Sequence, residues 1–175
     1  MSNRFRKAGF TLAEALLASA VLAMVVTAIT IPYSAAARND VANARLTVAS
    51  GLAQELMEEI LSKPYADPDL DGSGPEGRPG ADDVGPDTGE SERALFDNID
   101  DYNGFFEAAG SIRDARDNLV SDPAATGLSR EAFAGYVHVS GQSGFEDPEF
   151  VRVTVEIKFE NQPVATLTRL VYLIR

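Results

Sequence analysis

The chain has 175 residues with 27 acidic and 15 basic side chains, which gives a formal net charge of −12. Because binding to nucleic acid requires a basic surface that neutralises phosphates, this charge excludes nucleic acid from the expected partners. The chain has no cysteine, so an exported domain must be held by packing, hydrogen bonds or a bound cation instead of a disulfide.

A short basic leader, residues 1–9, precedes a long apolar run. Its charges are Arg4, Arg6 and Lys7. The apolar run, residues 10–31, measures about 33 Å as a helix, which is enough to cross the hydrocarbon core of a membrane. Basic residues on the short side of a span favour a cytoplasmic amino end, so we expect the rest of the chain outside the cytoplasm.

One acidic residue, Glu14, lies near the start of this apolar run. A carboxylate in hydrocarbon costs about 2.5 to 3.5 kcal/mol on insertion scales, so an intramembrane acid is by default a functional hypothesis. Cleavage after Gly9 would place a positive amine on Phe10, about one helical turn from the carboxylate, where the two charges attract. The alternative is an acid that reaches water at the membrane boundary.

The junction resembles the processing site of type IV pilins and type II secretion pseudopilins. The pattern of that family is a glycine, Phe-Thr-Leu, any residue and Glu, and Gly9 to Glu14 matches it throughout. The resemblance implies that prepilin peptidase cuts after Gly9 and methylates Phe10. It also implies assembly with other pilin or pseudopilin subunits on an inner-membrane platform, where Glu14 pairs with a neighbour's Phe10 amine. Thr11, the weaker assembly candidate, is interpreted as a local hydrogen-bonding group.

The helix is expected to continue beyond the membrane run, through residues 32–63. Pro32 removes one amide hydrogen bond and favours a local bend. Lys63 stands before Pro64, which predicts the helix end at residues 62–63. Apolar residues at helical spacing predict a face that packs on the protein's own sheet: Leu46, Ala49, Ala53, Met57 and Ile60.

An acidic segment rich in proline and glycine, residues 64–101, follows the helix, and its composition predicts an extended loop. Asp67, Asp69 and Asp71 stand at alternate positions before a glycine, as at the opening of a calcium-binding loop. The twelfth position is Arg78 instead of Glu, so the complete EF-hand pattern is absent. A calcium site on the three aspartates and a solvated acidic loop are the two alternatives.

A second resemblance concerns residues 96–102, Phe-Asp-Asn-Ile-Asp-Asp-Tyr. They resemble the Phe-Asp-Asp-Val-Asp-Asp-Tyr segment of minor pilins of the mannose-sensitive haemagglutinin type, with departures at Asn98 and Ile99. This resemblance favours a minor pilin. The apolar side chains of this region are expected to anchor it to the core: Phe96, Ile99, Tyr102, Phe105 and Phe106.

Residues 102–175 are predicted to form a globular region with a C-terminal antiparallel sheet of three or more strands. Apolar and polar residues alternate from Val151 to Phe159, and a turn at 161–163 leads to a second strand at 164–174. The remaining expected elements are a short helix at 112–120 and a short strand at 136–140. The fold class is therefore α+β and pilin-like, with one long N-terminal helix packed on the sheet.

The sequence offers little for catalysis, because His138 is the only histidine and no nucleophile motif accompanies it. We therefore expect a structural protein and not an enzyme. Three functions remain open: a minor pilin in a type IV pilus-like filament, a type II secretion pseudopilin in the periplasm, and a surface-binding module that uses the pilin route as its anchor. All three begin with a chain that crosses the lipid bilayer once.

Overall fold

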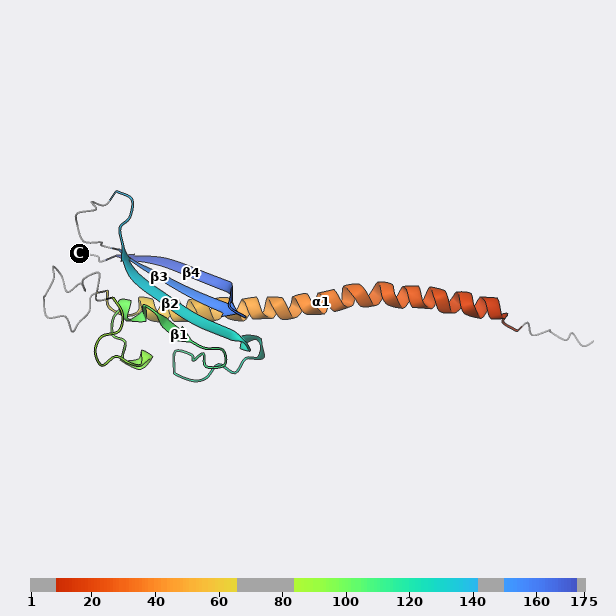
Figure 1. Cartoon of the computed structure of the whole chain (residues 1–175), viewed down its shortest axis with the longest axis horizontal. Coiled ribbons are helices and arrows are strands. Elements are labelled where there is room, and N and C mark those ends of the chain that lie inside the picture. Colours follow the sequence, from red (N-terminus) through yellow and green to blue (C-terminus); the bar gives the residue numbers. More distant parts are fainter. Residues whose placement is uncertain (1–8, 66–83, 142–149, 173–175) are drawn as a thin grey trace, which may run out of the picture. The chain divides into compact units, whose positions relative to one another are not determined.

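The computed structural model describes residues 9–65, 84–141 and 150–172, and it divides the chain into two units, Met1–Asn43 and Ala44–Arg175. One helix, α1 (Leu12–Leu61), begins in the first unit and ends in the second. The strands, all in the second unit, are β1 (Phe105–Glu107), β2 (Leu128–Val137), β3 (Phe150–Phe159) and β4 (Gln162–Tyr172) (Figure 1).

From Leu12 to Ile31, α1 carries mainly apolar side chains on every side, with Glu14 as the one charged residue, and the helix continues through Pro32. The hydroxyls of Thr27 and Thr30 donate hydrogen bonds to backbone carbonyls one turn earlier, at 2.8 and 2.7 Å. These polar groups therefore need no partner outside the helix. Among the described residues, α1 is the helix that is long and apolar enough to cross a membrane.

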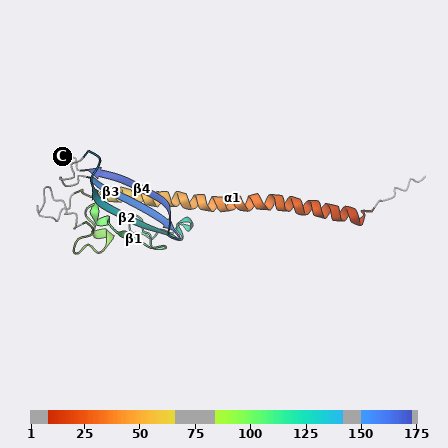
Figure 2. The same cartoon turned by 45° about the horizontal axis from the view of Figure 1, so that its top comes forward.

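In the second unit, the last turns of α1 pack on one face of an antiparallel sheet with the strand order β1-β2-β3-β4. Figures 1 and 2 both show the strands lying along the end of the helix. The helix buries Ala49, Leu52, Ala53, Leu56, Met57 and Ile60. The sheet buries Leu128, Ala132, Ala134, Val151, Val153, Val155 and Ile157 in the same core. This arrangement confirms the expected α+β, pilin-like fold class.

The apolar stripe predicted for the helix is mostly confirmed. Leu46 is the exception, because its side chain is 49% exposed. Leu52 and Leu56 lie on the buried face instead, three or four residues from the other buried positions. The predicted helix end is also confirmed, since α1 ends at Leu61 and the Ser62 N–H closes the last turn.

The predicted hairpin of β3 and β4 is confirmed, but its turn lies earlier than residues 161–163. Phe159 pairs directly with Gln162, so Glu160 and Asn161 form a two-residue turn. Both turn residues have positive φ, 51° and 63°. Hairpin turns with positive φ at both positions match the right-handed twist of the strands, and asparagine tolerates this conformation well.

The strand predicted at residues 136–140 was wrong in extent, because β2 begins at Leu128 and ends at Val137. Its inward positions include Arg130 and two alanines, so the alternation of apolar and polar residues is weak in the sequence. The three-residue β1, which pairs with β2 through Phe105↔Ala132 and the next two pairs, was also missed.

The short helix predicted at residues 112–120 was wrong. Arg113 and Leu119 instead form an isolated antiparallel bridge. Asp114 Oδ1 accepts hydrogen bonds from the backbone N–H groups of Arg116 and Asn118, at 2.9 and 2.8 Å. An aspartate that bonds its own neighbouring backbone competes with helix formation, which explains the turn.

The described end of the acidic segment is part of the core, in contrast to the extended loop expected from its composition. Two short 3-10 helices, Arg93–Leu95 and Asp100–Tyr102, lie on either side of the buried Phe96 and Ile99. Tyr102 is buried as well, as expected. Phe106, by contrast, is 60% exposed, so its predicted anchoring role was wrong.

Candidate functional site

The Gly9–Phe10 junction is exposed just before α1 begins. The Phe10 side chain is 86% exposed. A Cβ atom added at Gly9 would have no neighbour within 4 Å, so this chain itself does not require glycine there. The rest of the leader, residues 1–8, lies outside the described residues.

Thr11 and Glu14 form a reciprocal capping box at the first turn of α1. Glu14 Oε2 accepts hydrogen bonds from the backbone N–H and the hydroxyl of Thr11, at 2.9 and 3.0 Å. The Glu14 N–H donates back to Thr11 Oγ1 at 3.3 Å. This Thr-x-x-Glu pair satisfies donors that the first turn would otherwise leave unpaired. The Thr-x-x-Glu spacing is visible in the sequence, although Thr11 was predicted only to be a local hydrogen-bonding group.

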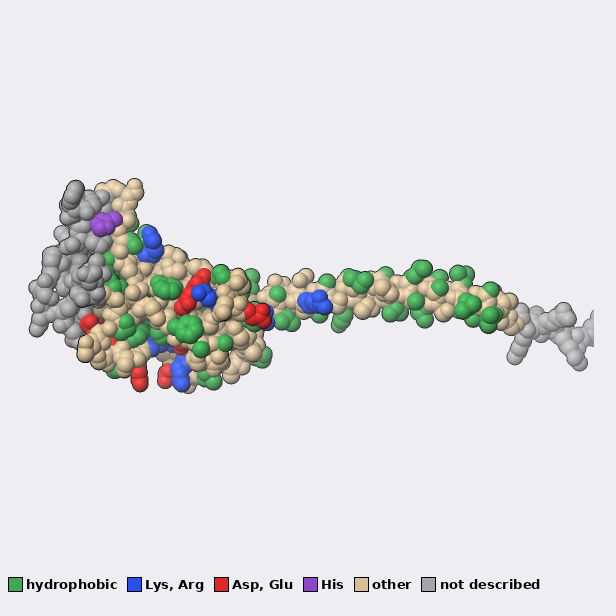
Figure 3. All heavy atoms as spheres, viewed as in Figure 1, with side chains coloured by type: hydrophobic (Ala, Val, Ile, Leu, Met, Phe, Trp, Pro, Cys, Tyr) green, Lys and Arg blue, Asp and Glu red, His purple; other side chains and the backbone are tan. Residues whose placement is uncertain are grey.

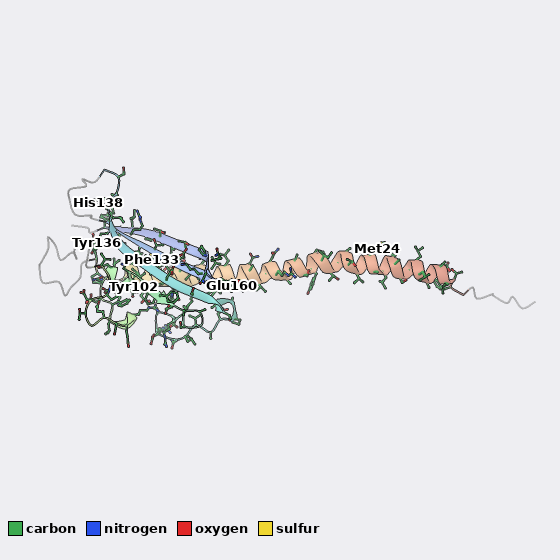
Figure 4. All side chains as sticks on the ribbon, viewed as in Figure 1. Met24, Tyr102, Phe133, Tyr136, His138 and Glu160 are labelled. Atoms are coloured by element: carbon green, nitrogen blue, oxygen red, sulfur yellow. The ribbon has the colours of Figure 1, made fainter. Side chains whose placement is uncertain are left out.

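Glu14 shares one side of the helix with the apolar side chains of Phe10, Leu17, Val21 and Val25. The whole first unit exposes large apolar groups, and Figures 3 and 4 show them along the helix, with Met24 labelled. The exposed set is Phe10, Leu12, Leu16, Leu17, Val21, Leu22, Met24, Val25, Val26, Ile29, Ile31, Tyr33 and Val41. A helix that is apolar all round requires lipid or other helices around it.

At its other end, α1 joins an ion pair in the second unit. Arg93 Nε donates a hydrogen bond to Glu59 Oε1 at 2.7 Å, and the Tyr102 hydroxyl donates to the same oxygen at 2.7 Å. Burial alone would raise the pKa of Glu59. The hydrogen bonds from Arg93 and Tyr102 and the nearby positive charges outweigh burial, so the net pKa of Glu59 is lowered.

A second ion pair lies deeper in the same unit, between Glu107 of β1 and Arg130 of β2. Arg130 Nε donates to Glu107 Oε2 at 2.7 Å, and the Arg130 side chain is completely buried. Arg130 also donates to the backbone carbonyls of Leu52 and Arg113, at 3.2 and 2.7 Å. This guanidinium therefore connects the helix, the sheet and the loop after β1. Because the charges of both pairs are matched, the arrangement favours a structural over a catalytic role.

The remaining candidate residues lie neither at the first turn of α1 nor at the two ion pairs of the second unit. Asp67, Asp69 and Asp71, the predicted calcium ligands, lie outside the described residues. His138 is exposed after the end of β2, as Figure 4 shows. A different group of carboxylates, which includes the buried Asp101, does come together in the described part of the chain.

Comparison with known proteins gives one match. Residues 4–30 match the prokaryotic N-terminal methylation motif, a range that includes Gly9, Phe10, Glu14 and most of the apolar run. No curated protein and no solved structure has significant similarity to the chain. The motif is that of structural subunits and not of catalysts, and the apolar helix that follows it fits a membrane-anchored subunit.

Proposed function

We propose that this chain, whose N-terminal methylation motif supports the type IV pilin and pseudopilin family, is a minor pilin that assembles into a type IV pilus-like filament. The same motif supports its processing by prepilin peptidase. The observation that carries the proposal is the exposed Gly9–Phe10 junction, followed at once by a capped helix whose first 20 residues are apolar on every side apart from Glu14. Cleavage there leaves a chain that begins at Phe10, two residues before α1, with both a free amine and an aromatic ring.

The apolar helix serves two successive environments in this proposal. Before assembly, the segment from Phe10 to Ile31 crosses the inner membrane with the basic leader in the cytoplasm and the sheet region outside it. After assembly, neighbouring helices replace the lipid around the same side chains. A helix with apolar groups on every side suits both states, because no direction around it requires water.

The capping box defines how Glu14 takes part in assembly. Its Oε2 already accepts two hydrogen bonds from Thr11. A carboxylate offers about four lone-pair sites, so a Phe10 amine from a neighbouring subunit can bind without breaking the cap. Thr11 then orients the carboxylate, and Glu14 sets the register between subunits.

The first experiment is the intact mass and amino-terminal sequence of the chain recovered from its native membrane. We expect a product that begins at N-methylated Phe10. Retention of residues 1–9 in cells with active prepilin peptidase would contradict the proposal and favour a simple membrane anchor. Recovery of the processed chain in sheared surface filaments supports a pilin, whereas recovery only in the periplasm supports a type II secretion pseudopilin.

The assembly role is tested by Glu14→Ala. We expect normal cleavage, because the junction is unchanged, and at least a tenfold loss of the chain from filaments, because an unpaired amine is left in an apolar core; tenfold corresponds to about 1.4 kcal/mol. Glu58→Ala is the matched control, an exposed acid of the same helix. Filament content of the Glu14 variant equal to that of this control would refute the pairing.

A further inference from the structure

Three carboxylates meet in the described part of the acidic segment: those of Glu90, Asp97 and Asp101. One oxygen of each lies within 4.8 Å of the others. Glu90 and Asp97 are partly buried, and Asp101 is 0% exposed. Three negative charges this close disfavour one another unless a proton or a cation lies among them. Acidic clusters are common on proteins, so a second observation is needed before a cation is inferred at this one.

The second observation is the buried, unmatched oxygen of Asp101. Its Oδ2 accepts hydrogen bonds from the backbone N–H groups of Asp97 and Asn98, at 2.8 and 2.9 Å. Its Oδ1 is also buried but has no hydrogen-bond partner among the described residues. A buried acceptor without a partner is costly and rare. Because Oδ2 is occupied by the backbone, Oδ1 is the oxygen that remains for a ligand.

The backbone holds this carboxylate rigidly in place. Asn98 Oδ1 accepts hydrogen bonds from the N–H groups of Asp100 and Asp101, at 2.8 and 3.1 Å. Ile99 and Tyr102, which precede and follow Asp100 and Asp101 in the sequence, are both buried in the core. The Asp101 carboxylate is therefore in position before any ligand arrives, which lowers the entropic cost of binding.

We propose that Glu90, Asp97 and Asp101 bind one hard divalent cation, and that calcium is the ion they fit. All three donors are carboxylate oxygens, the ligands such ions prefer. Calcium binds oxygen at about 2.3 to 2.6 Å, so oxygens bound to one ion lie no more than about 5 Å apart, and the three oxygens here all lie within 4.8 Å of one another. Magnesium demands near-ideal octahedral geometry and gives up its water reluctantly, so we expect it to bind three loop carboxylates less well than calcium does.

The cation joins two stretches of the same segment. Glu90 stands before the first 3-10 helix, whereas Asp97 and Asp101 stand after it. In a chain without cysteine, the ion provides the cross-link that a disulfide would otherwise supply.

The test uses the full processed chain, purified in detergent and stripped with EDTA. Calorimetric titration with calcium chloride should show one ion per chain. The melting temperature should rise by about 5 °C or more at a hundredfold excess over the Kd, with a smaller rise in magnesium. Absence of calcium-dependent heat and melting shift at 5 mM would overturn the proposal.

Variants locate the ion. Glu90→Gln should raise the Kd at least tenfold without lowering the melting temperature in EDTA, because it also removes a disfavoured charge. Asp97→Asn should weaken binding to a similar degree, and Glu92→Gln, an exposed acid beside the site, should bind as the original chain does. Full binding by both Glu90→Gln and Asp97→Asn would overturn the site.

A last variant separates this site from the calcium site predicted from the sequence. Replacing Asp67, Asp69 and Asp71 together by asparagine should leave the affinity unchanged. Loss of calcium binding in that variant, with retention in Glu90→Gln, would assign the ion to the preceding acidic loop and overturn the present proposal. Cleavage and filament entry are measured in separate experiments. Failure of the calcium proposal can therefore be distinguished from failure of the proposed minor pilin role.

Discussion

The buried pair of Glu107 and Arg130 provides the sharpest test of how the second unit is held together. We consider Arg130→Met, which keeps much of the side-chain volume but removes the charge. Arg130 is completely buried and donates to Glu107 and to two backbone carbonyls. Its loss leaves the Glu107 carboxylate with only the Arg113 N–H at 3.1 Å and the Arg93 guanidinium at 3.4 Å.

The expected loss follows from the cost of leaving the buried Glu107 carboxylate with a weaker ion pair, to Arg93 at 3.4 Å. Breaking such a pair by removing one partner costs about 3 to 5 kcal/mol. In a chain of this size, about 1 kcal/mol lowers the melting temperature by about 2 to 4 °C, so we expect a decrease of about 6 to 20 °C. Arg130→Met combined with Glu107→Gln should lose less, because the double variant buries no unpaired charge.

The measurement is thermal unfolding of the full chain in detergent. Unfolding is monitored by the near-ultraviolet circular dichroism of the tyrosines, because the chain has no tryptophan. Arg152→Met is the matched control, an exposed arginine on β3 that should change stability by no more than about 0.5 kcal/mol. A melting temperature for Arg130→Met equal to that of the control would refute the structural role of the pair. A double variant less stable than the single one would refute the argument from unpaired charge.

Two further predictions concern backbone geometry and pH. Gly127→Ala should destabilise the second unit by at least about 1 kcal/mol, because φ is +80° and the added Cβ would lie 2.9 Å from the Phe159 ring. Gly51→Ala, in an open helical position, should instead stabilise the unit by about 0.5 to 1 kcal/mol. Equal melting temperatures for the two variants would contradict this prediction. Glu59 has a lowered pKa, so its contribution to stability is present above the unfolded pKa of about 4.3 and is lost as pH falls through the folded value. Glu59→Gln should therefore be less stable than the original chain at pH 7 and lose less stability between pH 5 and pH 3. An equal change in melting temperature between pH 5 and pH 3 for Glu59→Gln and the original chain would show that the ion pair of Glu59 with Arg93 contributes nothing to stability.

The sequence by itself determined the features that depend on local chemistry. The processing junction and the apolar run are contiguous, so composition and a short motif identify them without knowledge of the fold. The strand from Val151 to Phe159 and the helix end before Pro64 are equally local, because side-chain alternation and a proline clash act within a few residues. The predicted strand and helix end were confirmed for that reason.

Tertiary structure decided the features that depend on residues distant in sequence. Arg130 occupies an inward position of β2 only because Glu107 of another strand neutralises it, so the strand carried a charge where its periodic pattern should have shown an apolar residue. The buried Asp101 likewise became a candidate cation ligand only when Glu90 and Asp97 were brought beside it. Hydrophobic patterning records which face of an element avoids water, whereas the pairing of buried charges depends on which elements meet.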